Sequence, residues 1–205
     1  MEQDGKYEVL ANAYRNPTKF SIIMLLAEQD KMTVTQMAEY VSVSRSNLYH
    51  FVSQLVEDRI LNEPEVVPKK NYVEKFYSLN EELFKSTDYD RWTGILKSKS
   101  LEEIRGLLSS VLMGYSMMLS MTANRIAHSS DSEAASLKDW LITKDMPWCT
   151  TYSLLSRKST ETIAPAVRKL DEALEATPSD QEAKSHFSRL LVIFLPFLGP
   201  GGIAP

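Results

Sequence analysis

The chain has 205 residues, a formal net charge of −4 and an apolar fraction of 43%. This length suits one or two domains, and the apolar fraction is enough for a buried core. The sequence has no run of about 18 apolar residues and no basic-then-apolar N-terminus, so we expect no membrane span, no signal peptide and a cytoplasmic protein. A single cysteine, Cys149, excludes an internal disulfide and a zinc site built on several thiolates.

Three helices are predicted in the first sixty residues. Asn16 can cap a helix from Pro17 to Gln29, whose first position suits proline. Thr33 can cap a second, short helix with a buried stripe formed by Val34, Met37, Ala38 and Val41.

The third helix begins after the cap Ser44 and is expected to end near Asp58. Its core-facing positions are Leu48, Phe51, Val52 and Leu55. Two short helices joined by a turn of about three residues form the helix-turn-helix pattern.

A hairpin is predicted directly after these helices, over about residues 61–79. β-Prone residues lie on both sides of the turn sequence "PKKN", which contains Pro68 and Asn71; they are Ile60, Val66, Val67, Tyr72, Val73, Phe76 and Tyr77. A hairpin in this position makes the helix-turn-helix a winged one.

A polar linker near 85–90 precedes a long helix from about Ser98 to His128. Its apolar seam alternates spacings of three and four residues and consists of Leu101, Ile104, Leu108, Val111, Tyr115, Met118 and Thr122. Further apolar positions widen this seam: Leu107, Leu112, Leu119 and Ile126.

The remaining segments predict a mixed but mostly helical end. Ser130 and Glu133 form a capping-box pattern for a short helix through Trp140 and Leu141, which Pro147 ends. Residues 150–156 and 187–198 resemble strands, and residues 160–176 an amphipathic helix. We therefore predict a mainly α protein: a winged helix-turn-helix of three helices and a hairpin over 1–85, then a mostly helical domain over 86–205 with a long helix and two short strands.

The N-terminal third resembles the winged helix-turn-helix of ArsR-like prokaryotic transcription regulators. The resemblance is carried by the helix that starts Asn-Pro-Thr, the "TVTQMA" of the second helix, the "VSRSNL" entry to the third and the closing "FYSL". It covers about Leu10 to Leu83 and implies a regulator that binds double-stranded DNA. We expect this regulator to act as a homodimer.

The sequence departs from the family pattern in two respects. Ser42 and Arg59 stand where the family often has glycine, so these two turns use less permissive residues. Metal-sensing members carry a cysteine pair on the second or third helix, and this chain has none there. The resemblance therefore does not imply a thiolate metal sensor.

Candidate DNA-binding residues lie on the outward side of the third helix and in the wing. A recognition helix reads bases through its N-terminal half, where Arg can bind guanine and Asn can bind adenine. The candidates are Ser44, Arg45, Ser46, Asn47, Tyr49, His50 and Ser53, with Lys69, Lys70 and Lys75 from the wing. The plainer alternatives are a solvated Arg45, a surface or packed His50, and wing lysines that serve only solubility.

The charge balance allows a rival hypothesis. Residues 1–85 contain 10 Lys/Arg and 13 Asp/Glu, whereas DNA-binding domains are commonly basic. Between Tyr40 and Val56, however, there is one cation and no acid. A DNA-binding dimer with few phosphate contacts per subunit is thus the leading hypothesis, and a winged helix that serves as a protein-interaction module is the alternative.

The second half has no catalytic constellation, so we expect neither an enzyme nor a cofactor or metal. The long helix has two interpretations. Its residues Leu101, Ile104, Leu108, Val111, Tyr115, Met118 and Met121 form core and a dimer interface, or its methionines line a pocket with Tyr115, Trp140 and Trp148 for a small apolar effector.

Overall fold

The computed structural model describes residues 2–84 and 89–142, together with 162–163, 165–166, 168–170 and 172–173. It divides the chain into two compact units, Met1–Ser130 and Asp131–Pro205. In the second unit, α8 spans Asp131–Ile142, and the described residues between 162 and 173 are helical, as the sequence predicts. The predicted strands at 150–156 and 187–198, and the helix end at Pro147, lie outside the described residues.

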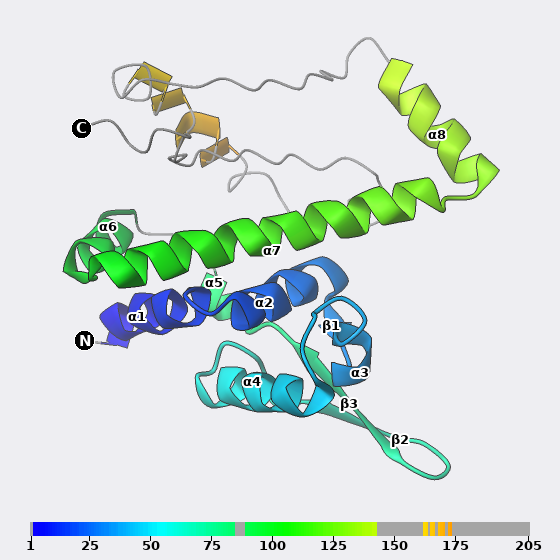
Figure 1. Ribbon diagram of the computed structural model, residues 1–205, viewed down its shortest axis with the longest axis horizontal. Coiled ribbons are helices and arrows are strands. Elements are labelled where there is room, and N and C mark those ends of the chain that lie inside the picture. Colours follow the sequence, from blue (N-terminus) through cyan, green and yellow to red (C-terminus); the bar gives the residue numbers. More distant parts are fainter. Residues whose placement is uncertain are drawn as a thin grey trace. The chain divides into compact units, whose positions relative to one another are not determined.

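The first unit is built of helices and one small sheet (Figure 1). Its elements in chain order are α1 (Glu2–Tyr14), α2 (Pro17–Gln29), β1 (Lys31–Met32), α3 (Val34–Met37), α4 (Arg45–Glu57), β2 (Glu65–Pro68), β3 (Val73–Ser78), α5 (Glu81–Phe84), α6 (Tyr89–Ser98) and α7 (Leu101–Ala127). The predicted winged helix-turn-helix and the long helix are confirmed. Helices α1 and α2 lie between α7 on one side and α4 with the wing on the other (Figure 1).

Side-chain caps fix where the three predicted helices begin. The Asn16 side chain accepts a hydrogen bond from the Lys19 N–H at 3.0 Å. Thr33 and Gln36 form a reciprocal capping box at α3. These caps satisfy N–H groups that have no partner within the helix, so the local sequence determines each start.

The sheet has the strand order β1-β3-β2 and is antiparallel throughout. Met32 pairs with Tyr77 and Val66 with Lys75, while the Lys69 N–H donates to the Tyr72 carbonyl at 2.8 Å across the hairpin tip. Strand β1 is too short to show an alternating pattern in the sequence. Ile60, predicted as part of the hairpin, is instead fully buried in the core before the wing begins.

Two asparagines close the base of the wing. The Asn62 side chain donates to the Leu79 carbonyl at 2.8 Å, and the Asn80 side chain donates to the Arg59 carbonyl at 3.0 Å. Arg59 itself has φ 55°, the left-handed region that favours glycine. The predicted strain at this position is therefore present, whereas Ser42 does not adopt a positive φ.

Small residues let α7 approach α1 and α2 closely. A Cβ atom added at Gly114 would lie 2.3 Å from Cδ1 of Phe20, and the Ser110 hydroxyl donates to the Arg15 carbonyl at 2.8 Å. Further along, Arg125 forms an ion pair with Glu28 at 3.0 Å. Helix α7 thus belongs to the first unit, and the predicted division after residue 85 lies inside that unit.

The buried face of α7 is not centred on the predicted apolar seam. Its buried residues are Ser110, Gly114 and Met121, while most seam residues are half-buried and Leu101 is 75% exposed. Apolar spacing draws attention to large side chains, but the closest helix contact here selects small ones. The role of the seam in a dimer interface or a pocket stays a prediction.

Aromatic rings join α1, α2 and α6. Tyr14 stacks on Trp92 with ring centroids 5.9 Å apart and meets Phe20 edge to face at 5.0 Å. Burial, and secondly the nearby Tyr115, raises the pKa of Tyr14 to about 12, so its hydroxyl stays protonated. The contacts explain why α1 and α6, which the sequence did not predict, are held against the unit.

Among the described residues, α7 is the one helix whose length and composition would allow it to cross a membrane. The core helices of many proteins have the same length and composition. One face of α7 packs against the rest of the first unit, through its contacts with Phe20, Arg15 and Glu28.

Candidate nucleic-acid interface

Helix α4 presents its polar side outward, as the sequence predicts. Leu48, Val52 and Leu55 are buried and Phe51 is half-buried. The predicted contact residues are all exposed: Ser44, Arg45, Ser46, Asn47, Tyr49, His50 and Ser53. The α4 surface is therefore free to meet a partner along its first three turns.

Some of these exposed side chains already have partners within the helix. The Ser44 hydroxyl accepts the Asn47 N–H at 3.3 Å and lies 3.2 Å from the Ser46 hydroxyl. The His50 ring nitrogen Nε2 lies 3.0 Å from the side-chain nitrogen of Gln54. Ser44 therefore acts first as a helix cap, which leaves Arg45 and Asn47 as the side chains best suited to reach bases.

The three wing lysines differ in their surroundings. Lys69 forms an ion pair with Glu74 at 3.5 Å, which offsets part of its charge. Lys70 and Lys75 are exposed, and no ion pair holds either of them within the part of the chain that the structure describes. The cations available to a phosphate are thus Lys70, Lys75 and Arg45.

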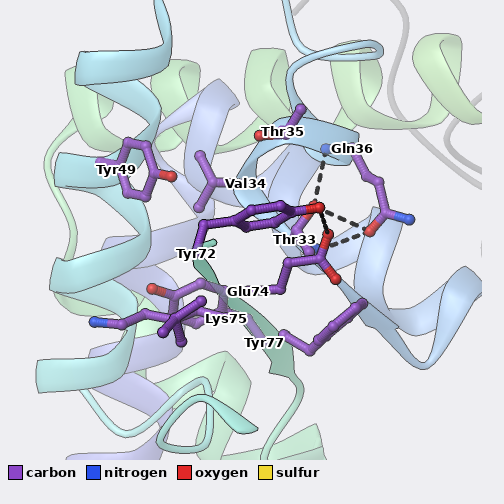
Figure 2. A pocket seen from close by; sticks show the side chains of 11 residues that line it. Thr33, Val34, Thr35, Gln36, Tyr49, Tyr72, Glu74, Lys75 and Tyr77 are labelled. Atoms are coloured by element: carbon purple, nitrogen blue, oxygen red, sulfur yellow. Dashed lines mark hydrogen bonds between the residues drawn. The ribbon is translucent and has the colours of Figure 1, made fainter. Parts of the chain in front are cut away.

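An open groove of about 690 Å³ lies between α3, α4 and the wing. It is lined by residues 33–36, by Tyr49 of α4 and by residues 72–77. Figure 2 shows the Tyr72 ring lying across the groove beside Val34, with its hydroxyl toward α3 and Glu74. The Tyr72 hydroxyl donates to a Glu74 carboxylate oxygen at 3.5 Å.

The groove connects the predicted α4 and wing surfaces. Arg45 precedes Tyr49 by four residues, so both lie on one side of α4. Tyr49 and Lys75 line the same groove. Arg45, Tyr49 and Lys75 therefore border one continuous surface, which is the arrangement expected of a winged helix that binds DNA.

Sequence reasoning missed the contribution of α3 to this surface. Thr35 and Gln36 are exposed on the groove wall, and Tyr72, used only as a strand signal, extends into it. These side chains come together because β3 returns beside α3 and α4. Their one signal in the sequence is that they are polar residues at the start of a helix and at a hairpin tip.

Tyr77 forms the closed side of the groove. Burial raises the pKa of its hydroxyl, and the neighbouring Tyr49 and Glu63 raise it further. The hydroxyl is therefore neutral at physiological pH, and the groove carries one acid, Glu74, and one base, Lys75, among its lining residues.

The residues expected to form a dimer interface or an effector pocket do not share one environment. Met121 is buried in the core, whereas Ile104, Leu108, Val111, Tyr115 and Met118 are half-buried and Leu101 is exposed. The side chain of Trp140, like all of Trp148, lies outside the described residues. Of the methionines proposed for a pocket, Met113 is exposed and Met121 is enclosed, so the helix spreads them over different faces.

Residues 16–63 match the family model described as "Bacterial regulatory protein, arsR family". No similar sequence is found among curated proteins. The matched segment contains α2, α3 and α4 and ends before β2. The predicted ArsR resemblance of the N-terminal part is confirmed, and a helix-turn-helix of this family indicates a transcription regulator that binds double-stranded DNA.

Proposed function

We propose that the protein is a sequence-specific transcription regulator that binds DNA as a homodimer in the cytoplasm. Helix α4 enters the major groove and the wing meets the backbone or the adjacent minor groove. The observation that carries the proposal is the continuous exposed surface from Arg45 through Tyr49 to Lys75. Its α4 residues lie within residues 16–63, which match the ArsR family model.

The roles of single residues follow from this placement. Arg45 and Asn47, exposed in the first turn of α4, contact base edges. Arginine can donate two hydrogen bonds to guanine, while asparagine can donate one hydrogen bond to adenine and accept one from it. Tyr49, His50 and Ser53 continue the same side, and Lys70 and Lys75 contact phosphates. Lys69 contributes less than Lys70, because Glu74 is its ion-pair partner.

Selection of bound DNA from a random pool at moderate salt tests the function. We expect enrichment of one site with two similar half-sites about one helical turn apart, since a dimer presents two copies of α4. The Arg45→Ala variant is expected to lose preference at one position in each half-site, equivalent to about 1–3 kcal/mol.

Two other results would change the proposal. If no sequence is enriched and a partner protein protects the α4 surface instead, the winged helix is a protein-interaction module. If the pool is enriched but Arg45→Ala keeps the same preference, the function stands and Arg45 does not read bases. Arg105→Ala on α7 is a matched control, because it removes an exposed arginine of the same unit that is not part of the proposed surface.

The homodimer is proposed to form through α7. Leu112, Leu119 and Ile126 recur every seven residues and are exposed on the helix, which is the spacing of a helix-helix seam. A small apolar effector at this helix would alter the separation of the two α4 helices and hence the DNA affinity. Thermal unfolding with and without candidate apolar ligands would detect such an effector.

A further inference from the structure

We infer that the groove between α3, α4 and the wing holds one DNA backbone strand through uncharged hydrogen-bond donors, chiefly Thr35, Gln36, Tyr49 and Tyr72. This inference rests on the proposed DNA-binding function and extends it to Thr35, Gln36 and Tyr72, which are neither on the outward side of α4 nor among the wing lysines. The proposed contacts are hydrogen bonds from uncharged side chains, so they would not make DNA affinity depend more steeply on salt concentration.

The position of the groove favours DNA backbone as its occupant. Tyr49 belongs both to the outward side of α4 and to the groove wall, so a duplex seated on α4 continues into the groove. On the opposite side the groove is bounded by Tyr72 and Lys75 of the wing (Figure 2). The DNA backbone strand that borders the major groove beside α4 would therefore run past these residues toward the wing.

The donors in the groove are available. Gln36 uses its side-chain oxygen in the α3 capping box, which leaves its amide nitrogen directed away from that bond. The hydroxyls of Thr35 and Tyr49 have no hydrogen-bond partner among the described residues. Tyr72 is 61% exposed, and its bond to Glu74 is long, at 3.5 Å, so it can be exchanged for a phosphate oxygen.

The charge of the groove does not favour a cation-driven site. Lys75 and Glu74 are its one base and one acid, and the Glu74 carboxylate also lies beside Lys69. Threonine, glutamine and tyrosine side chains commonly bind phosphate oxygens in protein–DNA complexes. Such contacts release no condensed counterions, unlike contacts from lysine or arginine.

This chemistry predicts a shallow salt dependence. Lys70 and Lys75 supply about two phosphate contacts per subunit, so a dimer would lose affinity with a log–log salt slope of about −4. The uncharged donors would add affinity without adding to that slope. The N-terminal segment could then bind DNA tightly although residues 1–85 carry a net negative charge.

The test measures DNA affinity of the full chain on its selected site over a range of salt concentrations. Tyr49→Phe, Tyr72→Phe and Thr35→Val are each expected to weaken binding by about threefold to tenfold at every salt concentration, with an unchanged slope. Lys70→Ala, in contrast, is expected to make the log–log salt slope of DNA affinity less steep by about one per subunit. Tyr40→Phe is the matched control, because this exposed tyrosine does not line the groove.

The outcomes separate the inference from the function on which it rests. If the wild type binds its site and the three groove variants bind equally well, the groove does not hold DNA, although the protein does. If the groove variants reduce the slope as Lys70→Ala does, the contact is not of the uncharged kind and the inference fails. If the wild type binds no DNA at any salt concentration, both the function and the inference are overturned.

Discussion

At the scale of single residues, Arg59 stores backbone strain next to the proposed interface. Its φ of 55° lies where a Cβ atom crowds the following carbonyl, a cost that glycine does not have. We predict that Arg59→Gly raises the free energy of unfolding by about 0.5–1 kcal/mol, as measured by urea denaturation. The neighbouring Asp58 has φ −73°, so Asp58→Gly should lower it instead; equal effects of both variants would contradict this explanation.

The Glu74 carboxylate is expected to weaken DNA binding. Its carboxylate lies in the groove, pairs with Lys69 and opposes any phosphate that approaches. Glu74→Gln should raise DNA affinity by about threefold to tenfold and steepen the salt slope by about one per subunit, because Lys69 becomes available to a phosphate. Glu102→Gln on α7 removes an acid from a different element and should change neither the DNA affinity nor the salt slope. If the Glu74→Gln protein binds DNA more weakly than the wild type, the prediction is wrong and the carboxylate orients the wing.

At the scale of helices and strands, local signals in the sequence were sufficient for some elements and not for others. Caps at Asn16, Thr33 and Ser44 made α2, α3 and α4 predictable, because each cap is a property of a few neighbouring residues. Helix α1 buries Tyr7 and Leu10 together with Ala11 and Ala13. Because the two alanines carry little apolar signal, no helical stripe stood out in the sequence and α1 was not predicted. The exposed side of α4 could be predicted, but the groove could not, because it forms only when residues 72–77 return beside α3.

The packing of α7 on α2 is tested by two glycines of the same helix. Phe20 occupies the space where a Cβ atom at Gly114 would lie, so Gly114→Ala should lower the free energy of unfolding by about 1–3 kcal/mol. Gly106→Ala is the control, since its Cβ atom would have no neighbour nearer than 3.8 Å. That variant should gain about 0.5–1 kcal/mol from helix propensity; a stabilised Gly114→Ala protein in the same thermal or urea experiment would contradict the observed packing.

At the scale of the whole molecule, α7 joins the DNA-binding elements to the proposed dimer. One face of the helix packs on α2 at Gly114 and donates a hydrogen bond from Ser110 to the Arg15 carbonyl, so it is part of the same unit as α4. The exposed residues Leu112, Leu119 and Ile126 lie on another face. If a second subunit bound to that face, the separation of the two α4 helices would be fixed, because α7 and α4 belong to the same packed unit.

This arrangement predicts that a single charge on the exposed stripe separates dimerisation from folding. Leu119 is 51% exposed in the monomer, so Leu119→Glu should leave the helical circular dichroism unchanged, yet raise the dimer dissociation constant at least about tenfold in analytical ultracentrifugation. Affinity for a two-half-site DNA should fall with it, while affinity for one half-site should not. Met113→Glu, at a position about 100° around the helix from Leu112, is the control. A wild-type protein that is monomeric at the concentrations where it binds DNA would overturn the homodimer, and an unaffected Leu119→Glu dimer would place the interface on a different surface.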